Sequence, residues 1–438
     1  MSNHQTIFRT VTNEVLEQVL LVSVALNGKD VDSSGVAEMI RLVESASGAV
    51  VHRISQKRNR PDAGYFVGRG KAGEIAAEAE NLGLTTIVFN HNLSPGQVSR
   101  LEEITKCKVI DRTELILAIF AVQARTPQAK LRIELAQLGY MLPRLSGMWH
   151  HLDRLGAGIG TRGPGETQLE VDRRRARTRM SSLEKKLEAI EAGAKVRHSR
   201  REGMFSVVLA GYTNSGKSTL LNRLCDAGVT SEDRLFATLD TTSRRLELPD
   251  GGSVIFSDTV GFIEKLPRSL LSSFRSTLDI VREADLILLL ADAADPDRLT
   301  KVSTVTDTLE KIDAGSIDRI TVWNKCDLPE ASGTEEMAIS ALTGEGIDRL
   351  LELLQKKRRE ALDWCSVKVD ICNGELEYWI RTNGIVDSFV RDDNSGAVEI
   401  ICGMYLGLSH LRKKLGHQAS NWVVEPLSAD RGVREERS

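Results

Sequence analysis

The chain has 438 residues, of which 41% are hydrophobic and 27% are charged, and its formal net charge at pH 7 is −3. A chain of this length is typical of about two to four globular domains. No apolar run reaches the ~18–20 residues of a membrane-spanning helix, and the first residues lack a secretory signal pattern. The six cysteines show neither a CxxC pair nor dense spacing, which fits reduced, buried thiols better than a disulfide framework. We therefore expect a cytoplasmic protein with reduced thiols.

Residues 1–125 alternate between apolar runs and helical patterns. Strands are expected at residues 19–24, 49–54, 86–89 and 108–110, and helices at 35–43, 72–82, 95–105 and 114–123. Alternation of this kind predicts an α/β domain with a mainly parallel sheet.

Two short motifs in this domain leave alternatives open. Residues 52–60 are rich in basic side chains and contain no acid, which fits either a solvated loop or a contact with RNA phosphates. Gly68-Arg69-Gly70-Lys71 could indicate a second nucleotide site. It follows a loop rather than a clear strand, however, so that interpretation is the less favoured one.

Residues 126–202 have a different character. Leucines recur at helical spacing on both sides of a glycine-rich stretch, residues 156–165, which predicts an antiparallel helical hairpin. A loop so rich in glycine suits close backbone approach to a partner. Residues 172–201 carry eleven Lys/Arg against four Asp/Glu, and they include Arg173-Arg174-Arg175. This segment predicts contact with a polyanion, with a merely solvated helix face as the alternative.

The next region contains a candidate phosphate site. An apolar run at residues 205–210 ends in Gly211-Tyr212-Thr213-Asn214-Ser215-Gly216-Lys217-Ser218-Thr219, and a helical pattern follows. A strand, a glycine loop and a helix in this order present backbone N–H groups to an anion. Lys217 is expected to reach the β- and γ-phosphates of a nucleotide, and the Ser218 hydroxyl to ligate Mg²⁺. The alternative is a plain glycine turn.

Asp258-Thr259-Val260-Gly261 follows a second strand-like run. Asp258 is placed to hold Mg²⁺ through water, and Gly261 can offer its N–H to a γ-phosphate. Ras-type enzymes have a glutamine directly after this motif to orient the attacking water. Phe262 occupies that place here, so intrinsic hydrolysis should be slow.

Two further motifs select the base. Asn324-Lys325-Cys326-Asp327 ends a third strand-like run, and a carboxylate at Asp327 can accept from two N–H groups of guanine that adenine lacks. Ser340-Ala341-Leu342 follows another short strand and could bring a backbone N–H to the guanine O6. The ordered set resembles the G1, G3, G4 and G5 motifs of translational and Ras-like GTPases. It predicts a GTP-binding domain with a doubly wound sheet over residues 203–362, in which Lys217, Asn214 and Gly261 act on the phosphates.

Residues 363–438 predict a small α+β domain. Strands are expected at residues 367–371, 386–391 and 398–401, with one helix after the first strand and another at 408–415. This β-α-β-β-α order fits a ferredoxin-like unit. The last eight residues predict a disordered tail.

The segment at residues 161–174, with the sequence TRGPGETQLEVDRR, resembles the signature of the HflX-type GTPases. Residues 65–71 and 109–113 are similar to the N-terminal domain of that family. The stretch Phe236-Ala237-Thr238-Leu239-Asp240 is similar to its switch I, in which Thr238 is the magnesium ligand. From the residues alone, Thr241 or Thr242 would serve equally well.

This resemblance implies a GTPase that binds GTP and GDP with Mg²⁺, and binds the large (50S) ribosomal subunit. It also implies dissociation of ribosomes, especially under stress, or a role in subunit biogenesis. The hairpin loop would approach 23S rRNA near the peptidyl-transferase region, with Arg162, Arg173, Arg174 and Arg175 as RNA contacts. Some family members bind ATP through the N-terminal domain. We expect a cytoplasmic, ribosome-associated monomer that could also associate peripherally with a membrane.

Asn214 has two interpretations. It resembles the asparagine of potassium-dependent GTPases, which would add K⁺ as a cofactor. Alternatively it hydrogen-bonds its own backbone, as loop asparagines commonly do.

Three functions remain open at this level: a GTPase switch that acts on the ribosome, an ATP-dependent RNA-remodelling enzyme with a regulatory GTPase domain, and a passive assembly factor that binds rRNA.

Overall fold

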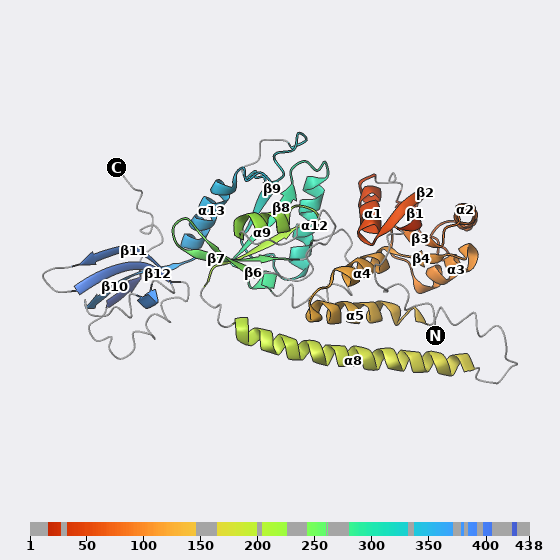
Figure 1. The fold of residues 1–438 in the computed structure, drawn as a ribbon, viewed down its shortest axis with the longest axis horizontal. Helices are drawn as coiled ribbons and strands as arrows, with labels where there is room; N and C mark the ends of the chain where they lie inside the picture. The colour runs from red at the N-terminus through yellow and green to blue at the C-terminus, as the bar shows by residue number, and fades with distance from the viewer. Residues whose placement is uncertain are drawn as a thin grey trace. The chain divides into compact units, whose positions relative to one another are not determined.

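The structure, a computed structural model, consists of two compact units (Figure 1). It describes residues 16–27, 33–145, 164–198, 204–225, 243–259, 261, 280–331, 337–370, 378–380, 384–391, 397–404 and 423–426. The first unit contains the chain up to Glu191, and the second contains the two sheets that lie further along the sequence. Among the helices that the structure describes, none combines the length and apolarity of a membrane span.

The first unit is built on a four-stranded sheet with the order β2-β1-β3-β4 and parallel pairing throughout. Its strands are β1 (Glu17–Leu26), β2 (Gly48–Arg58), β3 (Thr86–Phe89) and β4 (Lys108–Ile110), and its helices are α1 (Ser33–Ser45), α2 (Arg69–Asn81), α3 (Pro95–Thr105) and α4 (Arg112–Gln123). The predicted parallel α/β domain is confirmed. A core cluster that includes Leu20, Ile75, Phe89 and Leu101 joins the sheet to α2 and α3.

The loop interpretation of residues 52–60 was wrong for most of that stretch, because β2 continues to Arg58. β1 provides the backbone partners for this extension, since Leu26 is in register with Arg58. β2 lies at the edge of the sheet, where charged side chains are tolerated and oppose edge-to-edge association. Gly68 precedes α2 and donates its N–H to Gln56 Oε1 at 2.9 Å, so a turn and not a strand leads into the Gly68–Lys71 motif, as expected.

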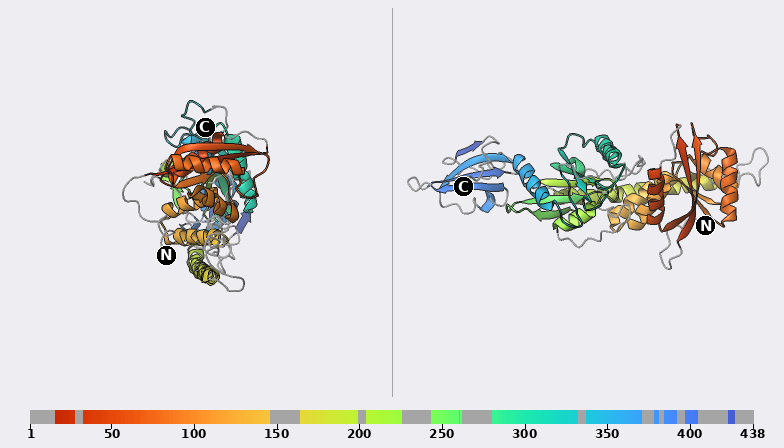
Figure 2. Two further views of the ribbon diagram at one scale, coloured as in Figure 1. Left: turned by 90° about the vertical axis from the view of Figure 1, so that its right-hand side faces the viewer. Right: turned by 90° about the horizontal axis from the view of Figure 1, so that it is seen from above.

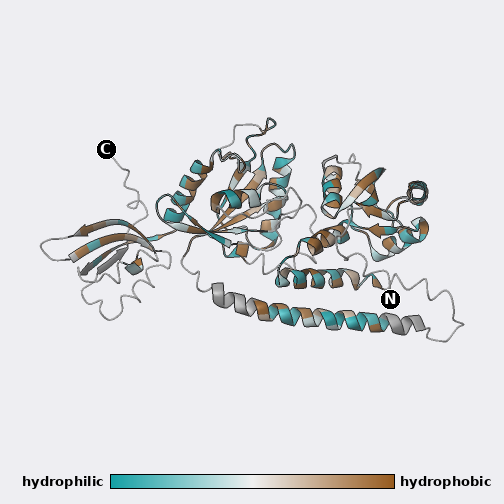
Figure 3. Cartoon of the chain, viewed as in Figure 1, coloured by the Kyte–Doolittle hydropathy of each residue, from teal (hydrophilic) through white to brown (hydrophobic). Residues whose placement is uncertain are grey.

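The helical hairpin is formed by α5 (Pro127–Met141) and α8 (Pro164–His198). The two helices run side by side in opposite directions (Figures 1 and 2). Arg179 joins them, because its Nε and Nη2 donate to the two carboxylate oxygens of Glu134 at 2.7 and 2.9 Å. The side chains of Leu183 and Leu187 are buried, whereas most of α8 is hydrophilic (Figure 3). α8 begins at Pro164, so the last two residues of the predicted glycine loop belong to the helix. Residues 146–163, which include the rest of that loop, lie outside the described residues.

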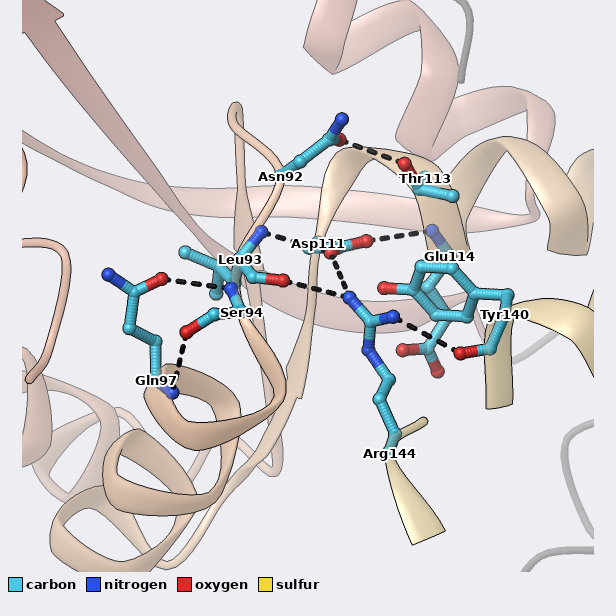
Figure 4. A network of polar contacts seen from close by, with 9 residues as sticks. All are labelled: Asn92, Leu93, Ser94, Gln97, Asp111, Thr113, Glu114, Tyr140 and Arg144. Atoms are coloured by element: carbon cyan, nitrogen blue, oxygen red, sulfur yellow. Dashed lines mark hydrogen bonds and ion pairs between the residues drawn. The ribbon is translucent and has the colours of Figure 1, made fainter. Parts of the chain in front are cut away.

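A buried carboxylate holds the end of α5 against the sheet (Figure 4). Asp111 is fully buried and accepts from the backbone N–H groups of Leu93 (3.1 Å) and Glu114 (2.9 Å). It also accepts from Arg144 Nη2 at 3.0 Å. The Arg144 guanidinium lies 3.5 Å above the ring of Tyr140 and donates to the Leu93 carbonyl at 2.8 Å. The start of α4, the start of α3 and the residues after α5 therefore share one anchor.

The two residues after Asp111 also make contacts within the unit. The guanidinium of Arg112 is buried and pairs with Glu38 on α1. Thr113 donates its hydroxyl to Asn92 Oδ1 at 2.9 Å (Figure 4). The segment at 109–113, which carried part of the family resemblance, thus stabilises the unit by tying α4 to three other elements.

The second unit contains a five-stranded sheet with the order β6-β7-β5-β8-β9. The strands are β5 (Ser206–Gly211), β6 (Ser243–Glu247), β7 (Ser253–Asp258), β8 (Leu286–Asp292) and β9 (Arg319–Asn324), and the helices are α9 (Lys217–Cys225), α12 (Arg298–Lys311) and α13 (Ile347–Glu360). All pairs are parallel except β6–β7, and β6 was not predicted. The strand order reverses direction at β5, so ligands are expected at the carboxyl ends of the strands near β5. The predicted doubly wound sheet is confirmed.

The last sheet has the order β11-β12-β10-β13 and is antiparallel throughout. Its strands are β10 (Asp363–Asp370), β11 (Gly384–Arg391), β12 (Ala397–Met404) and β13 (Val423–Pro426). The first three were predicted, and β13 was missed because it is short and ends in proline. Its addition completes the strand order of a ferredoxin-like unit. The expected helix at 408–415 and the tail lie outside the described residues.

The described cysteines are all free thiols, as expected. Cys365 and Cys402 face each other across β10 and β12 with their sulfur atoms 3.7 Å apart, which is a hydrogen-bonding distance and not a disulfide bond.

Candidate nucleotide-binding site

The glycine loop connects β5 directly to α9, as the sequence predicted. Gly211 is the last residue of β5, and α9 begins at Lys217. At two positions of the loop, only glycine avoids a steric clash. A Cβ at Gly211 would lie 2.4 Å from the carbonyl oxygen of Leu290, and a Cβ at Gly216 would lie 2.1 Å from Asn324 Nδ2. Gly216 also has a φ of 92°, which side chains rarely permit.

Lys217 is a buried cation that faces the inside of this loop. Its Nζ donates to the carbonyl oxygens of Gly211 (3.0 Å) and Tyr212 (2.8 Å). Burial lowers the pKa of Lys217 to about 8, and the charge of Asp258 opposes that shift only in part. An ammonium group under such a desolvation cost is stabilised by any anion that enters the loop. The loop is therefore built to receive a phosphate.

The residues expected to hold Mg²⁺ lie together. Ser218 Oγ donates to Asp258 Oδ2 at 3.0 Å, so the hydroxyl at the start of α9 meets the carboxylate at the end of β7. A hydroxyl and a carboxylate are hard oxygen donors, which is the donor type that Mg²⁺ prefers. The donor set thus fits a magnesium ion, which Ser218 and Asp258 would hold. Thr259 supports the carboxylate, since its hydroxyl donates to the Leu209 carbonyl at 2.7 Å.

Of the remaining residues in the Asp258–Gly261 motif and the predicted switch I, only Gly261 belongs to the described part of the chain. Gly261 is buried, whereas Val260 and the five residues Phe236, Ala237, Thr238, Leu239 and Asp240 lie outside the described residues. The choice between Thr238, Thr241 and Thr242 as magnesium ligand is therefore not tested.

Asn324 connects the phosphate loop to the two base-recognition motifs. Its Nδ2 donates to the Ser215 carbonyl at 2.8 Å, and its Oδ1 accepts from the Ala341 N–H at 2.9 Å. Cys326 donates its N–H to the Ile339 carbonyl at 3.1 Å. This hydrogen bond joins the Asn324–Asp327 motif to the segment that leads into the Ser340–Leu342 motif. Segments more than a hundred residues apart in sequence are thus held by one amide side chain.

The predicted base-recognition residues differ in exposure. Asp327 is exposed and Leu342 is 73% exposed, whereas Ser340 and Ala341 are buried. A carboxylate at this place can accept from a base without first breaking an internal ion pair among the described residues.

Asp292 is a site residue that the sequence reasoning missed. Its Oδ2 lies 2.6 Å from Lys325 Nζ, so it holds the lysine of the Asn324–Asp327 motif. A polar residue at the carboxyl end of a buried central strand is a usable signal for such a role. Lys301 is a further cation near the loop. It pairs with Asp295, and its ammonium lies 5.3 Å from the centre of the Tyr212 ring.

A phosphate loop, a hydroxyl–carboxylate pair for magnesium and an exposed carboxylate for guanine, all at the carboxyl edge of a parallel sheet, define a P-loop GTPase. Comparison with known proteins gives the same class. Residues 206–325 match the family described as 50S ribosome-binding GTPase. Residues 33–121 and 123–201 match the N-terminal and middle regions of a GTP-binding GTPase family, and residues 329–421 match the HflX C-terminal domain.

Relatives that match most of the chain identify the family. The GTPase HflX of Alkalihalophilus pseudofirmus is 46% identical over 316 residues, which cover 71% of this chain and 74% of the relative. The GTPase HflX of Escherichia coli strain K12 is 40% identical over 400 residues, which cover 88% and 93%. The chain belongs to the HflX family of GTPases.

The predicted RNA contacts lie on α8, except for Arg162, which is outside the described residues. Arg174 and Arg175 are exposed and Arg173 is partly buried. Arg175 lies 3.9 Å from Asp172, a weak surface pair. Residues 172–179 contain five arginines and one aspartate, so this part of α8 has a concentrated positive charge.

Proposed function

We propose that this GTPase docks on the large ribosomal subunit through its helical hairpin, and that its GTP-bound form separates ribosomes into subunits. A ribosome-associated GTPase is what the family matches support. The observation that carries the finer proposal is the positive first half of α8. Arg174 and Arg177 are exposed and make no ion pair with the described part of the chain. They are free to meet phosphates, beside a glycine-rich segment that suits close approach to RNA.

In the proposed mechanism the GTPase domain binds the nucleotide, and the helical hairpin binds the ribosome. Lys217 and the loop N–H groups would bind the β- and γ-phosphates, and Ser218 and Asp258 would hold Mg²⁺, which would neutralise phosphate charge. Ordering of the segments around the γ-phosphate would favour the docked form of the protein. Because equilibrium coupling is reciprocal, GTP should then tighten ribosome binding by the factor by which the ribosome tightens GTP binding. The docked protein would contact the 23S rRNA near the peptidyl-transferase region. Hydrolysis of GTP would release it from this site.

Exchange of two exposed arginines tests the docking proposal. Arg174→Ala/Arg177→Ala should leave GTP hydrolysis by the free protein unchanged and weaken its stimulation by 50S subunits. The slope of log affinity against log salt for 50S binding should fall by about 1 per arginine, because each phosphate contact releases counterions. Lys185→Ala/Lys186→Ala is the matched control, since both lysines are exposed on the same helix. Full stimulation and an unchanged salt slope in the arginine variant would mean that this face of α8 is only solvated.

The same assays separate the remaining alternatives. A ribosome-dissociating GTPase reduces light scattering by 70S ribosomes with GTP and not with ATP. An ATP-dependent RNA-remodelling enzyme hydrolyses ATP in the presence of rRNA even when Lys217 is replaced. A passive assembly factor binds 50S subunits without faster hydrolysis of either nucleotide.

A role for potassium is a further part of the proposal. Asn214 adopts a left-handed backbone with a φ of 61°, which asparagine tolerates and which Gly tolerates as well. Asn214→Gly therefore removes the side-chain oxygen without adding strain. We expect wild-type hydrolysis to be faster in KCl than in NaCl at equal ionic strength, and the difference to vanish in Asn214→Gly. Equal wild-type rates in the two salts would leave Asn214 with its backbone role alone.

A further inference from the structure

A buried arginine near the end of α13 packs against the turn between β6 and β7. The side chain of Arg358 is fully buried, and its Nη2 lies 2.6 Å from Asp250 Oδ2. Asp250 also accepts the N–H of Gly252 at 3.1 Å, and Leu248 donates its N–H to the Gly252 carbonyl at 2.7 Å. The guanidinium thus binds the carboxylate that organises this turn.

Gly252 leaves the space in which the guanidinium lies. A Cβ at Gly252 would be 1.3 Å from Arg358 Nη1 and 2.0 Å from its Cζ. The guanidinium of Arg358 therefore packs directly on the backbone of Gly252, the residue before β7. Leu246 and Leu248 belong to the same buried cluster as Leu350 and Leu354 of α13, so apolar contacts already hold the hairpin against the helix.

The ion pair between Arg358 and Asp250 is not an efficient way to stabilise the folded protein. Arg358 Nε and Nη1 are buried donors that make no hydrogen bond within the described part of the chain. A buried ion pair of this kind seldom contributes more stability than a well-packed apolar side chain, and unsatisfied donors lower its contribution further. What an arginine adds over leucine or methionine is a directed, charge-specific contact that permits only one position of the turn.

The turn leads directly to the magnesium side of the nucleotide site. β7 begins at Ser253 and ends at Asp258, whose carboxylate accepts from Ser218. The β6–β7 register is marked by a hydrogen bond between the hydroxyls of Ser243 and Ser257, 2.9 Å apart. A slip of this hairpin by one residue would move Asp258 along the strand by about 3.3 Å, which is enough to remove it from the magnesium site.

The end of α13, which carries Arg358, is itself held in place by two further contacts. Arg359 Nη2 lies 2.7 Å from Asp387 on β11, and its carbonyl accepts from Trp364 Nε1 at 3.0 Å. The last turn of α13 is therefore held by the C-terminal sheet on one side and holds the β6–β7 turn on the other.

We propose that Arg358 is a positioning residue for GTP hydrolysis: its contact with Asp250 and Gly252 sets the position of the β6–β7 hairpin and thereby of Asp258. It acts through the hairpin and does not touch the nucleotide.

Arg358→Met tests the proposal, because methionine fills a similar volume without charge. We expect the variant to fold with a melting temperature near that of the wild type, and kcat for GTP to fall about tenfold or more, since small displacements of a reacting group are costly. KM for GTP should change little. Hydrogen exchange of the amides in Ser253–Asp258 should become faster. Arg358→Lys should restore part of kcat, and Asp250→Asn should lower it in the same direction.

Lys357→Met is the matched control. Lys357 lies next to Arg358, carries the same kind of charge and pairs with Asp318 at the surface, so kcat and hairpin exchange should remain at their wild-type values. Gly252→Ala displaces the guanidinium without removing it, and serves as a second test if Arg358→Met does not fold. Wild-type kcat and exchange rates in Arg358→Met, or in Gly252→Ala, would overturn the proposal. So would a loss of kcat that only follows the fraction of unfolded protein.

Discussion

Replacement of Lys217 by alanine is expected to lower the kcat of GTP hydrolysis by about 10³-fold or more, since a preorganised donor to the transferred group contributes this much in comparable sites. Lys217 is buried within the loop, and its Nζ lies against the Gly211 and Tyr212 carbonyls that line it. Alanine leaves the loop backbone in place and removes the charge that would follow the γ-phosphoryl group. The expected loss is therefore one of catalysis and phosphate binding.

Stability should not fall with activity in this variant. Burial lowers the pKa of Lys217 from 10.5 to about 8, so the unfolded chain binds this proton more tightly than the folded protein does. The ammonium form therefore costs folding free energy below pH 8, and the cost disappears as the pH rises through 10.5. Lys217→Ala removes that cost at neutral pH, and its melting temperature should equal or exceed that of the wild type.

Steady-state hydrolysis and thermal unfolding of the two proteins check both expectations. Lys301→Ala is the control, because Lys301 is a nearby cation whose ammonium lies 5.3 Å from the centre of the Tyr212 ring and makes an ion pair with Asp295. Its hydrolysis should stay within a few-fold of the wild type. Undiminished turnover by Lys217→Ala, in a preparation free of other nucleotidases, would contradict the assignment of the loop.

The phosphate site could be predicted because its signal is local. Residues 211–219 contain a loop bounded by two glycines and followed at once by a helix that begins at a charged residue, and this order can be recognised within a few consecutive residues. The strands that end at Asp258 and Asn324 were found for a similar reason, since they are apolar runs that stop at a polar residue. Their meeting at one edge follows from parallel pairing, which the alternation of strands and helices predicts.

Long-range partners carried no such signal. Arg358 and Asp250 are 108 residues apart, and Asp111 and Arg144 are 33 apart. In a single sequence each is an ordinary charged residue, and nothing local indicates that burial will pair it. The basic half of β2 was misjudged for a related reason. Its charges hid a strand whose formation depends on pairing with β1 and not on the propensity of its own residues.

The largest effect on specificity is expected at Asp327. Asp327→Asn should weaken GTP binding by about 10²-fold or more, because a site built to accept two donors discriminates strongly when that match is lost. The carboxylate would accept both the ring N–H and the exocyclic amine of guanine, whereas an amide can accept only one of them and turns a donor toward the other. Xanthine has an oxygen in place of the exocyclic amine, so the amide of asparagine matches it with one accepted and one donated hydrogen bond.

The geometry of the site indicates that this exchange will alter recognition and leave the surroundings in place. Asp327 is exposed, while the contacts that join the base motifs to the phosphate loop are made by Asn324. Titration calorimetry with GTP and xanthosine triphosphate measures the result. A second exposed carboxylate gives the control, since Glu345→Gln should bind both nucleotides as the wild type does. The expected outcome is a reversal of preference in Asp327→Asn alone. GTP affinity equal to that of the wild type, or no gain for the xanthine nucleotide, would show that another group reads the base.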